Sequence, residues 1–165
     1  MTRAPLTIRQ VEGAAELAAV RGLLEEYGRT PDWAVCFTTF EKELALLPGP
    51  CRPPEGRLLA AWAGGVAGGC VALQPLGGGD VELRRLYVRP AMRGMGIGRA
   101  LAERAIEEAR ASGHRRIRLH TLPSMRAAHA LYEAAGFRPS EPYGGVGVEG
   151  AIFLALDLGP TTRRS

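Results

Sequence analysis

A glycine-rich run between a strand-forming and a helix-forming segment constrains this chain more than any other feature. The strand-forming segment is Glu82 to Val88, the run is Arg93-Gly-Met-Gly-Ile-Gly98, and the helix-forming segment begins at Arg99. Glycines at such a junction let backbone N–H groups approach an anion closely, and the start of the helix adds partial positive charge. Because Arg93 and Arg99 add full charges, the junction is predicted to hold a diphosphate.

Length and composition favour a single globular domain. The 165 residues are enough for one substantial core, and a hydrophobic fraction of 46% with 23% charged residues excludes a disordered or fibrous class. No apolar run in the sequence is long enough to span a membrane. We expect one domain over residues 1–160, followed by a flexible C-terminal tail at residues 161–165.

Cysteine usage and charge favour a cytoplasmic protein with a small anionic ligand. Cys36, Cys51 and Cys70 are widely spaced and form no CxxC pair, so neither a disulfide framework nor a zinc site is expected. The net charge is +4, which suits an anionic ligand. Charges of both signs alternate over residues 103–110, a pattern typical of a solvated helix face. We therefore expect neither nucleic acid nor a membrane as a partner.

Hydrophobic periodicity predicts an α/β fold, with a mixed sheet and helices on both of its faces. Strands are expected at 6–10, 57–63, 66–73, 81–88, 115–122, 137–139 and 151–158. Helices are expected at 13–28, from Thr38 or Thr39 to Leu47, from the glycine run to Ser112-Gly113, and at 124–135. The predicted order is β-α-α-β-β-β-α-β-α-β-β, without an internal repeat.

Two other phosphate-binding patterns do not fit the glycine run. A Rossmann fingerprint, G-x-G-x-x-G, would need glycine at the position of Arg99 or of Leu101. A P-loop would need Gly-Lys-Ser/Thr, and no lysine is nearby. What remains is the pattern Arg93-x-x-Gly96-x-Gly98, which follows a strand ending in Leu-Tyr-Val-x-Pro.

Two motifs together resemble the GNAT superfamily of acyl-CoA N-acyltransferases. The first is the R/Q-x-x-G-x-G/A pattern at 93–98, and the second is Ala128-His-Ala-Leu-Tyr-Glu-Ala-Ala-Gly-Phe137, similar to the family's A-x-x-L-Y-x-x-x-G-F segment. They occur in the family's order, with a helix and a strand between them. The resemblance implies a GNAT-like fold, a mixed and mostly antiparallel sheet of about seven strands flanked by about four helices.

The resemblance also implies an activity. Such enzymes transfer an acetyl group from acetyl-CoA to a primary amine by direct attack in a ternary complex, and they need no metal. The acceptor would be a small-molecule amine or a peptide, and a homodimer is an assembly common among relatives. The alternative is a non-catalytic, regulatory module that binds acyl-CoA. The sequence identifies neither the amine, nor the acyl-chain length, nor the oligomeric state.

The family's cofactor-binding residues map onto three segments of this chain. The backbone at Leu86, Tyr87 and Val88 would bind the pantetheine arm, and the Val88 N–H would polarise the thioester carbonyl. Ser124 would replace the asparagine that many relatives have where Met125 stands. The pyrophosphate would lie over Arg93, Gly94, Met95, Gly96, Ile97, Gly98 and Arg99.

Tyr132 and Glu82 are the candidates for acid–base chemistry. Tyr132 matches the family tyrosine near the CoA sulfur, and its hydroxyl would protonate the leaving thiolate. The alternative is core packing beside Leu131. Glu82 would deprotonate the amine, often through water. The alternative is a surface carboxylate paired with Arg84, in which case water would do this work.

Two residues outside the motifs are further candidates for the acceptor side. His120 lies at the end of its strand and would face the substrate there, although a hydrogen-bonded or exposed histidine is the ordinary alternative. Tyr143 lies in the loop before the last strand, and loops commonly carry specificity. The histidines form no H-x-x-x-H pair, so no metal site is expected.

Overall fold

The computed structural model describes residues 5–29, 40–143 and 150–159, and its elements follow the predicted order. The cap predicted at Thr38 or Thr39 and the tail predicted at 161–165 lie outside the described residues. A short 3-10 helix, η2, was not predicted. The elements are β1 (Leu6–Gln10), α1 (Gly13–Gly28), α2 (Phe40–Ala45), β2 (Arg57–Ala63), β3 (Val66–Gly77), β4 (Asp80–Val88), η2 (Pro90–Met92), α3 (Ile97–Ala111), β5 (Arg116–Thr121), α4 (Arg126–Ala134), β6 (Arg138–Pro139) and β7 (Ile152–Asp157).

The strands form one seven-stranded sheet in the order β1-β2-β3-β4-β5-β7-β6. Among the described strands, β4 and β5 pair in parallel and every other neighbouring pair is antiparallel. The parallel pair follows from the crossover through α3, since parallel neighbours need a long connection. This topology confirms the predicted mixed, mostly antiparallel sheet.

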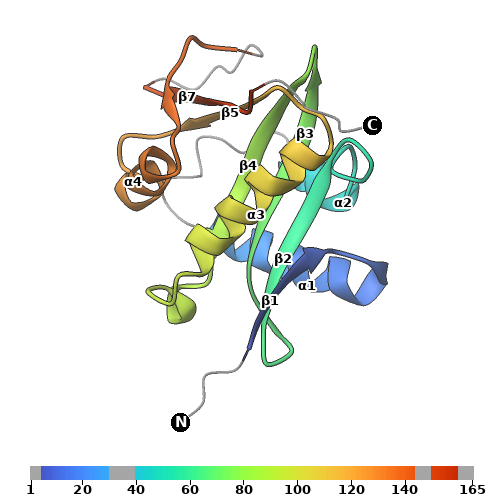
Figure 1. Cartoon of the computed structure of the whole chain (residues 1–165). Helices are drawn as coiled ribbons and strands as arrows, with labels where there is room; N and C mark the ends of the chain where they lie inside the picture. Colours follow the sequence, from blue (N-terminus) through green and yellow to red (C-terminus); the bar gives the residue numbers. More distant parts are fainter. Residues whose placement is uncertain (1–4, 30–39, 144–149, 160–165) are drawn as a thin grey trace.

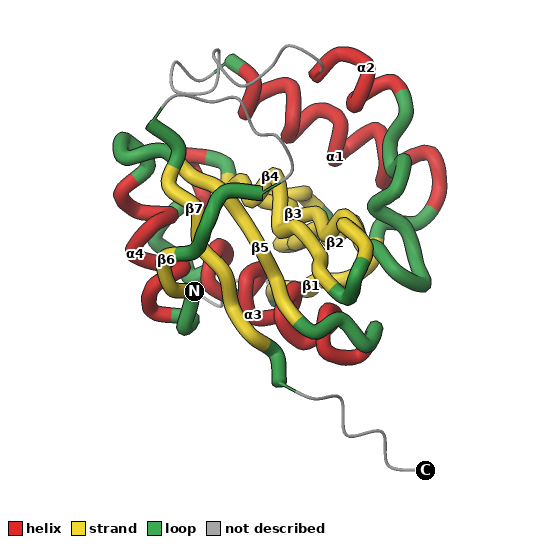
Figure 2. The backbone as a smooth tube through the Cα atoms, turned by 90° about the horizontal axis from the view of Figure 1, so that it is seen from above, coloured by secondary structure: helices red, strands yellow, loops and turns green. Residues whose placement is uncertain are grey.

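Helices cover both faces of the sheet, as Figures 1 and 2 show. The helices α1 and α2 lie on one face, and α3 and α4 lie on the other. Each face has its own buried cluster, and β2 contributes to both, with Leu58 facing the α1 side and Leu59 facing the α3 side. Because both faces of β2 and β3 are covered, these two strands are nearly continuous apolar runs, whereas β5 alternates apolar and polar residues.

A β-bulge interrupts β4, where the sequence predicts an uninterrupted strand. Ala72 of β3 pairs with Arg84 and Cys70 pairs with Tyr87, so two residues of β4 stand opposite one residue of β3. Arg85 has a φ of 57°, which is uncommon outside glycine. Its guanidinium donates to Glu43 Oε2 of α2, from Nε at 3.0 Å and from Nη2 at 2.7 Å. This ion pair holds the strained residue in place, and the bulge bends the strand.

After three paired positions, β4 and β5 separate. The two strands pair only at Asp80–Arg116, Val81–Ile117 and Glu82–Arg118 within the described residues. Among the described residues, the second half of β4 therefore keeps β3 as a neighbour but has no strand on its other side. The resulting fork leaves backbone groups of β4 available to a ligand.

Candidate functional site

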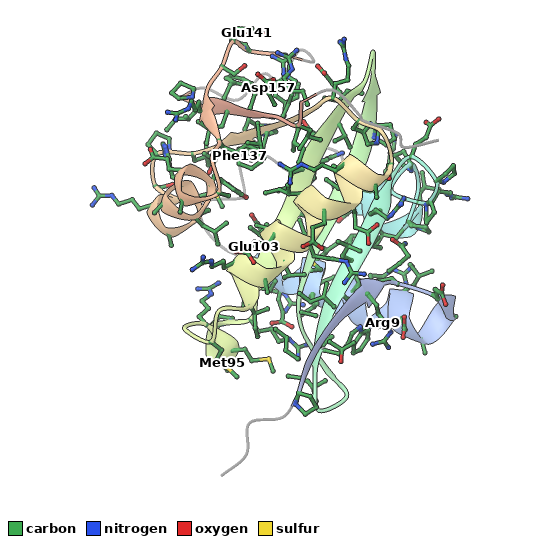
Figure 3. All side chains as sticks on the ribbon, viewed as in Figure 1. Arg9, Met95, Glu103, Phe137, Glu141 and Asp157 are labelled. Carbon is green, nitrogen blue, oxygen red and sulfur yellow. The ribbon has the colours of Figure 1, made fainter. Side chains whose placement is uncertain are left out.

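A cavity of about 550 Å³ lies beside the half of β4 that does not pair with β5, between the start of α3 and the segment that enters α4. Most of the residues predicted to bind the cofactor line it. Met95 and Tyr132 do not belong to its described wall, and Figure 3 shows Met95 on the loop that leads into α3, where it is 41% exposed. The predicted residues that line the cavity are Leu86, Tyr87, Val88, Arg93, Gly94, Gly96, Ile97, Gly98, Arg99 and Ser124.

The glycine run gives the cavity a wall of backbone N–H groups. Gly96 is the N-cap of α3 with a φ of 79°, a left-handed conformation that glycine adopts without strain, and no side chain caps the helix. The first N–H groups of an α-helix have no partner within the helix. Because residues 96–99 line the cavity, these donors and the positive end of the helix dipole are available to an anion there.

Three arginines surround this end of the cavity. Arg93 Nε donates to Val88 O at 3.0 Å, and its guanidinium carbon lies 5.9 Å from the centroid of the Tyr87 ring. The Arg99 side chain is 81% exposed and pairs with Glu103 at 2.9 Å. Arg126, in the first turn of α4, also lines the cavity and was missed at the sequence level. Its position just before the second motif, which begins at Ala128, was the sequence signal that could have identified it.

The orientation of Val88 follows from its pairing with β3. Val88 stands opposite Gly69, and the next N–H, that of Arg89, donates to Gly68 O at 2.9 Å. Successive N–H groups of a strand point to opposite sides. The Val88 N–H therefore points away from β3, toward the side that β5 has left. A donor in this position can stabilise a developing negative charge on an oxygen.

Tyr132 is a buried residue of α4. It is 7% exposed, and its ring centroid lies 5.7 Å from that of Phe137. Burial raises the pKa of its phenol, so the hydroxyl stays protonated across the neutral range. This widens the gap between the phenol and a thiol of pKa about 8.5, so hydrogen-bond donation to sulfur is more favourable than full ionisation of the phenol. Ala128 and Leu131, on the same helix, line the cavity.

Glu82 is buried on the α1 side of the fork, at the last position where β4 pairs with β5. Its Oε1 lies 3.2 Å from Arg84 Nε, and its Oε2 accepts a hydrogen bond of 2.6 Å from the Tyr143 hydroxyl. Burial and the Glu82 carboxylate raise the pKa of Tyr143, which keeps that hydroxyl a donor. The structure thus brings Glu82 and Tyr143 together. It also shows the ion pair with Arg84 that the alternative expected, but on a buried carboxylate rather than a surface one.

A network of charges holds Arg84 in place. Its guanidinium pairs with Glu43 Oε1 at 3.1 Å and contacts Gln74 Oε1 closely. Arg118 of β5 lies on the same side, with its guanidinium carbon 4.7 Å from the centroid of the Tyr143 ring. Glu82 is therefore fixed from two directions rather than free to rotate.

Each of the three histidines contacts a different residue. His114 Nε2 lies 2.6 Å from Glu55 O, His129 pairs with Glu133 at 2.8 Å, and His120 Nδ1 lies 3.9 Å from Glu82 Oε2. Among the described residues, no group of three or more His, Cys, Asp or Glu side chains is arranged to bind a metal ion.

The described helices include none with the length and apolar character required to cross a bilayer.

Comparisons with known proteins agree with this geometry. Residues 19–137 match the model of the acetyltransferase (GNAT) family. An uncharacterized N-acetyltransferase of Schizosaccharomyces pombe is 32% identical, over 93% of this chain and 95% of that protein. The uncharacterized N-acetyltransferase YjgM of Escherichia coli is 34% identical, over 72% of this chain and 71% of that protein.

Solved structures share the fold. A GNAT-family acetyltransferase of Staphylococcus aureus superposes with a TM-score of 0.81 at 15% identity, over 94% of this chain and all of that one (100%). The structure of yncA from Salmonella typhimurium with its cofactor acetyl-CoA superposes with a TM-score of 0.70 at 24% identity, over 93% of this chain and 94% of that one. The sequence motifs, the forked sheet and these matches together show that this chain belongs to the acetyltransferase (GNAT) family.

Proposed function

We propose that this protein transfers the acetyl group of acetyl-CoA to a primary amine by direct attack within a ternary complex. The observation that carries the proposal is one cavity that joins the uncapped start of α3 to the backbone of Leu86–Val88. The first surface suits a diphosphate, and the second suits an extended chain that ends in a thioester. The similar fold of yncA, which was solved with acetyl-CoA, supports this choice of donor.

The wall of the cavity supports the proposed cofactor-binding roles. The N–H groups of residues 96–99 and the guanidinium groups of Arg93 and Arg99 bind the pyrophosphate. The backbone of Leu86, Tyr87 and Val88 binds the pantetheine arm as a neighbouring strand would. The Val88 N–H donates to the carbonyl oxygen as it becomes an oxyanion.

Proton transfer is assigned to groups on either side of the fork. Glu82 takes a proton from the ammonium form of the acceptor, directly or through water, which frees the nitrogen lone pair. The nitrogen attacks the acetyl carbonyl, a C–N bond forms and the C–S bond breaks. The Tyr132 hydroxyl gives its proton to the departing sulfur, and the proton that the nitrogen loses as the amide forms returns to the Tyr132 oxygen through water. Glu82 releases the first proton to solvent. The products are free CoA thiol and the N-acetylated amine.

A thiol-release screen tests the proposal. Acetyl-CoA is mixed with the protein and with a panel comprising a polyamine, amino acids, an aminoglycoside, and peptides with a free N-terminus or lysine. The expected result is amine-dependent thiol release, with acetylated amine detected by mass spectrometry. Acetyl-CoA binding by calorimetry without thiol release for any amine would contradict transfer and leave a binding module instead.

A further inference from the structure

We propose that His120 and Glu82 together form the binding site for the acceptor's ammonium group, with His120 Nδ1 and Glu82 Oε2 accepting two N–H bonds from the same nitrogen. The inference rests on the proposed acetyl transfer and goes beyond it by adding His120 as a residue that binds the acceptor. It also specifies an acceptor nitrogen that carries at least two hydrogens. A primary ammonium meets this requirement, whereas a quaternary ammonium does not.

The first observation is an unsatisfied buried atom. His120 Nδ1 is buried and has no hydrogen-bond partner within the described residues. Glu82 Oε2 lies 3.9 Å from this nitrogen, too far for a direct hydrogen bond. For a nitrogen placed between them, about 2.8 Å from each, the directions to the two acceptor atoms would form roughly a right angle. This is close to the angle between two N–H bonds of an ammonium group. Leaving such a polar atom unpaired is costly, so a ligand that pairs it gains affinity.

The second observation is that Glu82 is already held in position. Arg84 pairs with Oε1 and the Tyr143 hydroxyl donates to Oε2. An ionised carboxylate offers about four acceptor positions, so Oε2 keeps capacity for another donor. Binding an ammonium group therefore requires little reorganisation of this side chain, which favours affinity.

The third observation is the location of the pair. Glu82 is the last residue of β4 that pairs with β5, opposite Arg118, and His120 lies two residues further along β5. Side chains two residues apart on a strand share a face. Glu82 and His120 therefore lie on the two arms of the fork, and both lie on the face of the sheet that α1 covers.

Neighbouring groups favour a cation with an attached carbon chain. His120 stands opposite Phe153 of β7, and the ring centroids of Phe153 and Tyr143 are 5.6 Å apart. The Arg118 guanidinium already lies over the Tyr143 ring, so the Phe153 ring is the aromatic surface that would attract the ammonium group and pack against the adjoining methylenes. Burial lowers the pKa of His120, which favours a neutral imidazole with a lone pair at neutral pH.

Steady-state kinetics of two His120 variants test the assignment. The acceptor is the panel amine that releases thiol fastest. H120F removes the acceptor atom and is expected to raise the KM for this amine by about 10- to 100-fold, as loss of one bond to a charged group predicts. H120N places an amide oxygen near the position of Nδ1 and is expected to stay within about threefold of the native KM. The KM for acetyl-CoA should be unchanged in both variants.

The control is H114F, a histidine-to-phenylalanine change outside the fork, which should leave both KM values unchanged. An amine KM for H120F within about threefold of the native value would overturn the proposal, since a lost charged hydrogen bond costs more. The proposal also fails if H120N is no better than H120F. An active H120F with altered KM for acetyl-CoA alone would likewise contradict it.

Nitrogen NMR of the imidazole tests the site without turnover. The protein is labelled with ¹⁵N-histidine, saturated with CoA and titrated with methylammonium or tetramethylammonium, and the His120 signals are assigned from H120F. The expected result is an unprotonated Nδ1 that shifts with methylammonium and not with tetramethylammonium. A protonated Nδ1, or equal shifts with both ions, would overturn the site. Absence of thiol release from the native protein would refute the acetyl transfer, while this titration still decides the ammonium site.

Discussion

Replacing Gly98 by leucine is expected to remove most of the affinity for CoA while leaving the fold intact. Gly98 is the second residue of α3, and a Cβ built there lies 3.4 Å from Leu131 Cδ1 and 3.6 Å from Val88 Cγ2. A methyl group therefore fits at a tight but ordinary contact. The outer carbons of leucine must extend into the cavity, between the N–H groups of α3 and an approaching pyrophosphate.

The magnitude follows from the bonds that would be lost. Hydrogen bonds to charged groups contribute about 1.5–3 kcal/mol each. If the anion loses two amide donors, binding weakens by about 3–6 kcal/mol, or roughly 10²- to 10⁴-fold in Kd. G98A should bind CoA much more tightly than G98L. Its stability should equal or exceed that of the native protein, because alanine favours the helix by about 0.5–1 kcal/mol over glycine.

Isothermal titration calorimetry with CoA measures the effect, and thermal unfolding checks that each variant is folded. G22L is the matched control, because Gly22 is also a helical glycine, in α1, and a Cβ there meets no atom within 4 Å. The reasoning is refuted if folded G98L binds CoA within about threefold of the native protein, less than the loss of one such bond. Equal losses in G22L and G98L would also refute it.

Three further predictions concern the acid, the core and pH. Tyr132→Phe should slow thiol release while leaving the Kd for acetyl-CoA nearly unchanged, and native turnover in this variant would contradict the assigned role. Leu101→Ala, at a fully buried position of α3, should lower the free energy of unfolding in urea by about 2–5 kcal/mol; a loss well under 1 kcal/mol would contradict the packing. Burial raises the pKa of the Cys51 thiol to about 11 and that of Cys70 to about 12. As pH rises, the thiols of the unfolded chain lose their protons before the buried thiols of the folded protein do. The contribution of the two buried thiols to the free energy of unfolding is therefore present below the ordinary thiol pKa of about 8.5 and is lost as pH rises through 11 and 12. Urea titrations at increasing pH should show this decline, and a flat profile would contradict it.

Element order and most of the residues that line the cavity were predictable because their signals are local. Glycine turns, strand alternation and helical periodicity each act over a few residues, and the glycine run places its own N–H groups at a helix start. The longer extent of β3, to Gly77, was not predicted, because it depends on pairing partners such as Glu82 opposite Gln74.

The geometry around Glu82 and Arg85 was not predictable because it depends on distant pairs. Nothing local marks Arg85 as the residue with positive φ, since Glu43, which holds it, lies 42 residues earlier. The bond from Tyr143 to Glu82 spans 61 residues. Tyr143 and Glu82 were each candidates on their own, but the sequence alone gives no reason to place them in contact.

Amine-dependent acetyl transfer by the native protein tests the central claim most directly. Acetyl-CoA, the protein and each amine of the panel are incubated together, and free thiol and acetylated amine are quantified in the same sample. The proposed function predicts that one amine yields thiol and N-acetylated product in equal amounts, well above the rate without protein. Tight binding of acetyl-CoA with no acetylated product for any amine would contradict it.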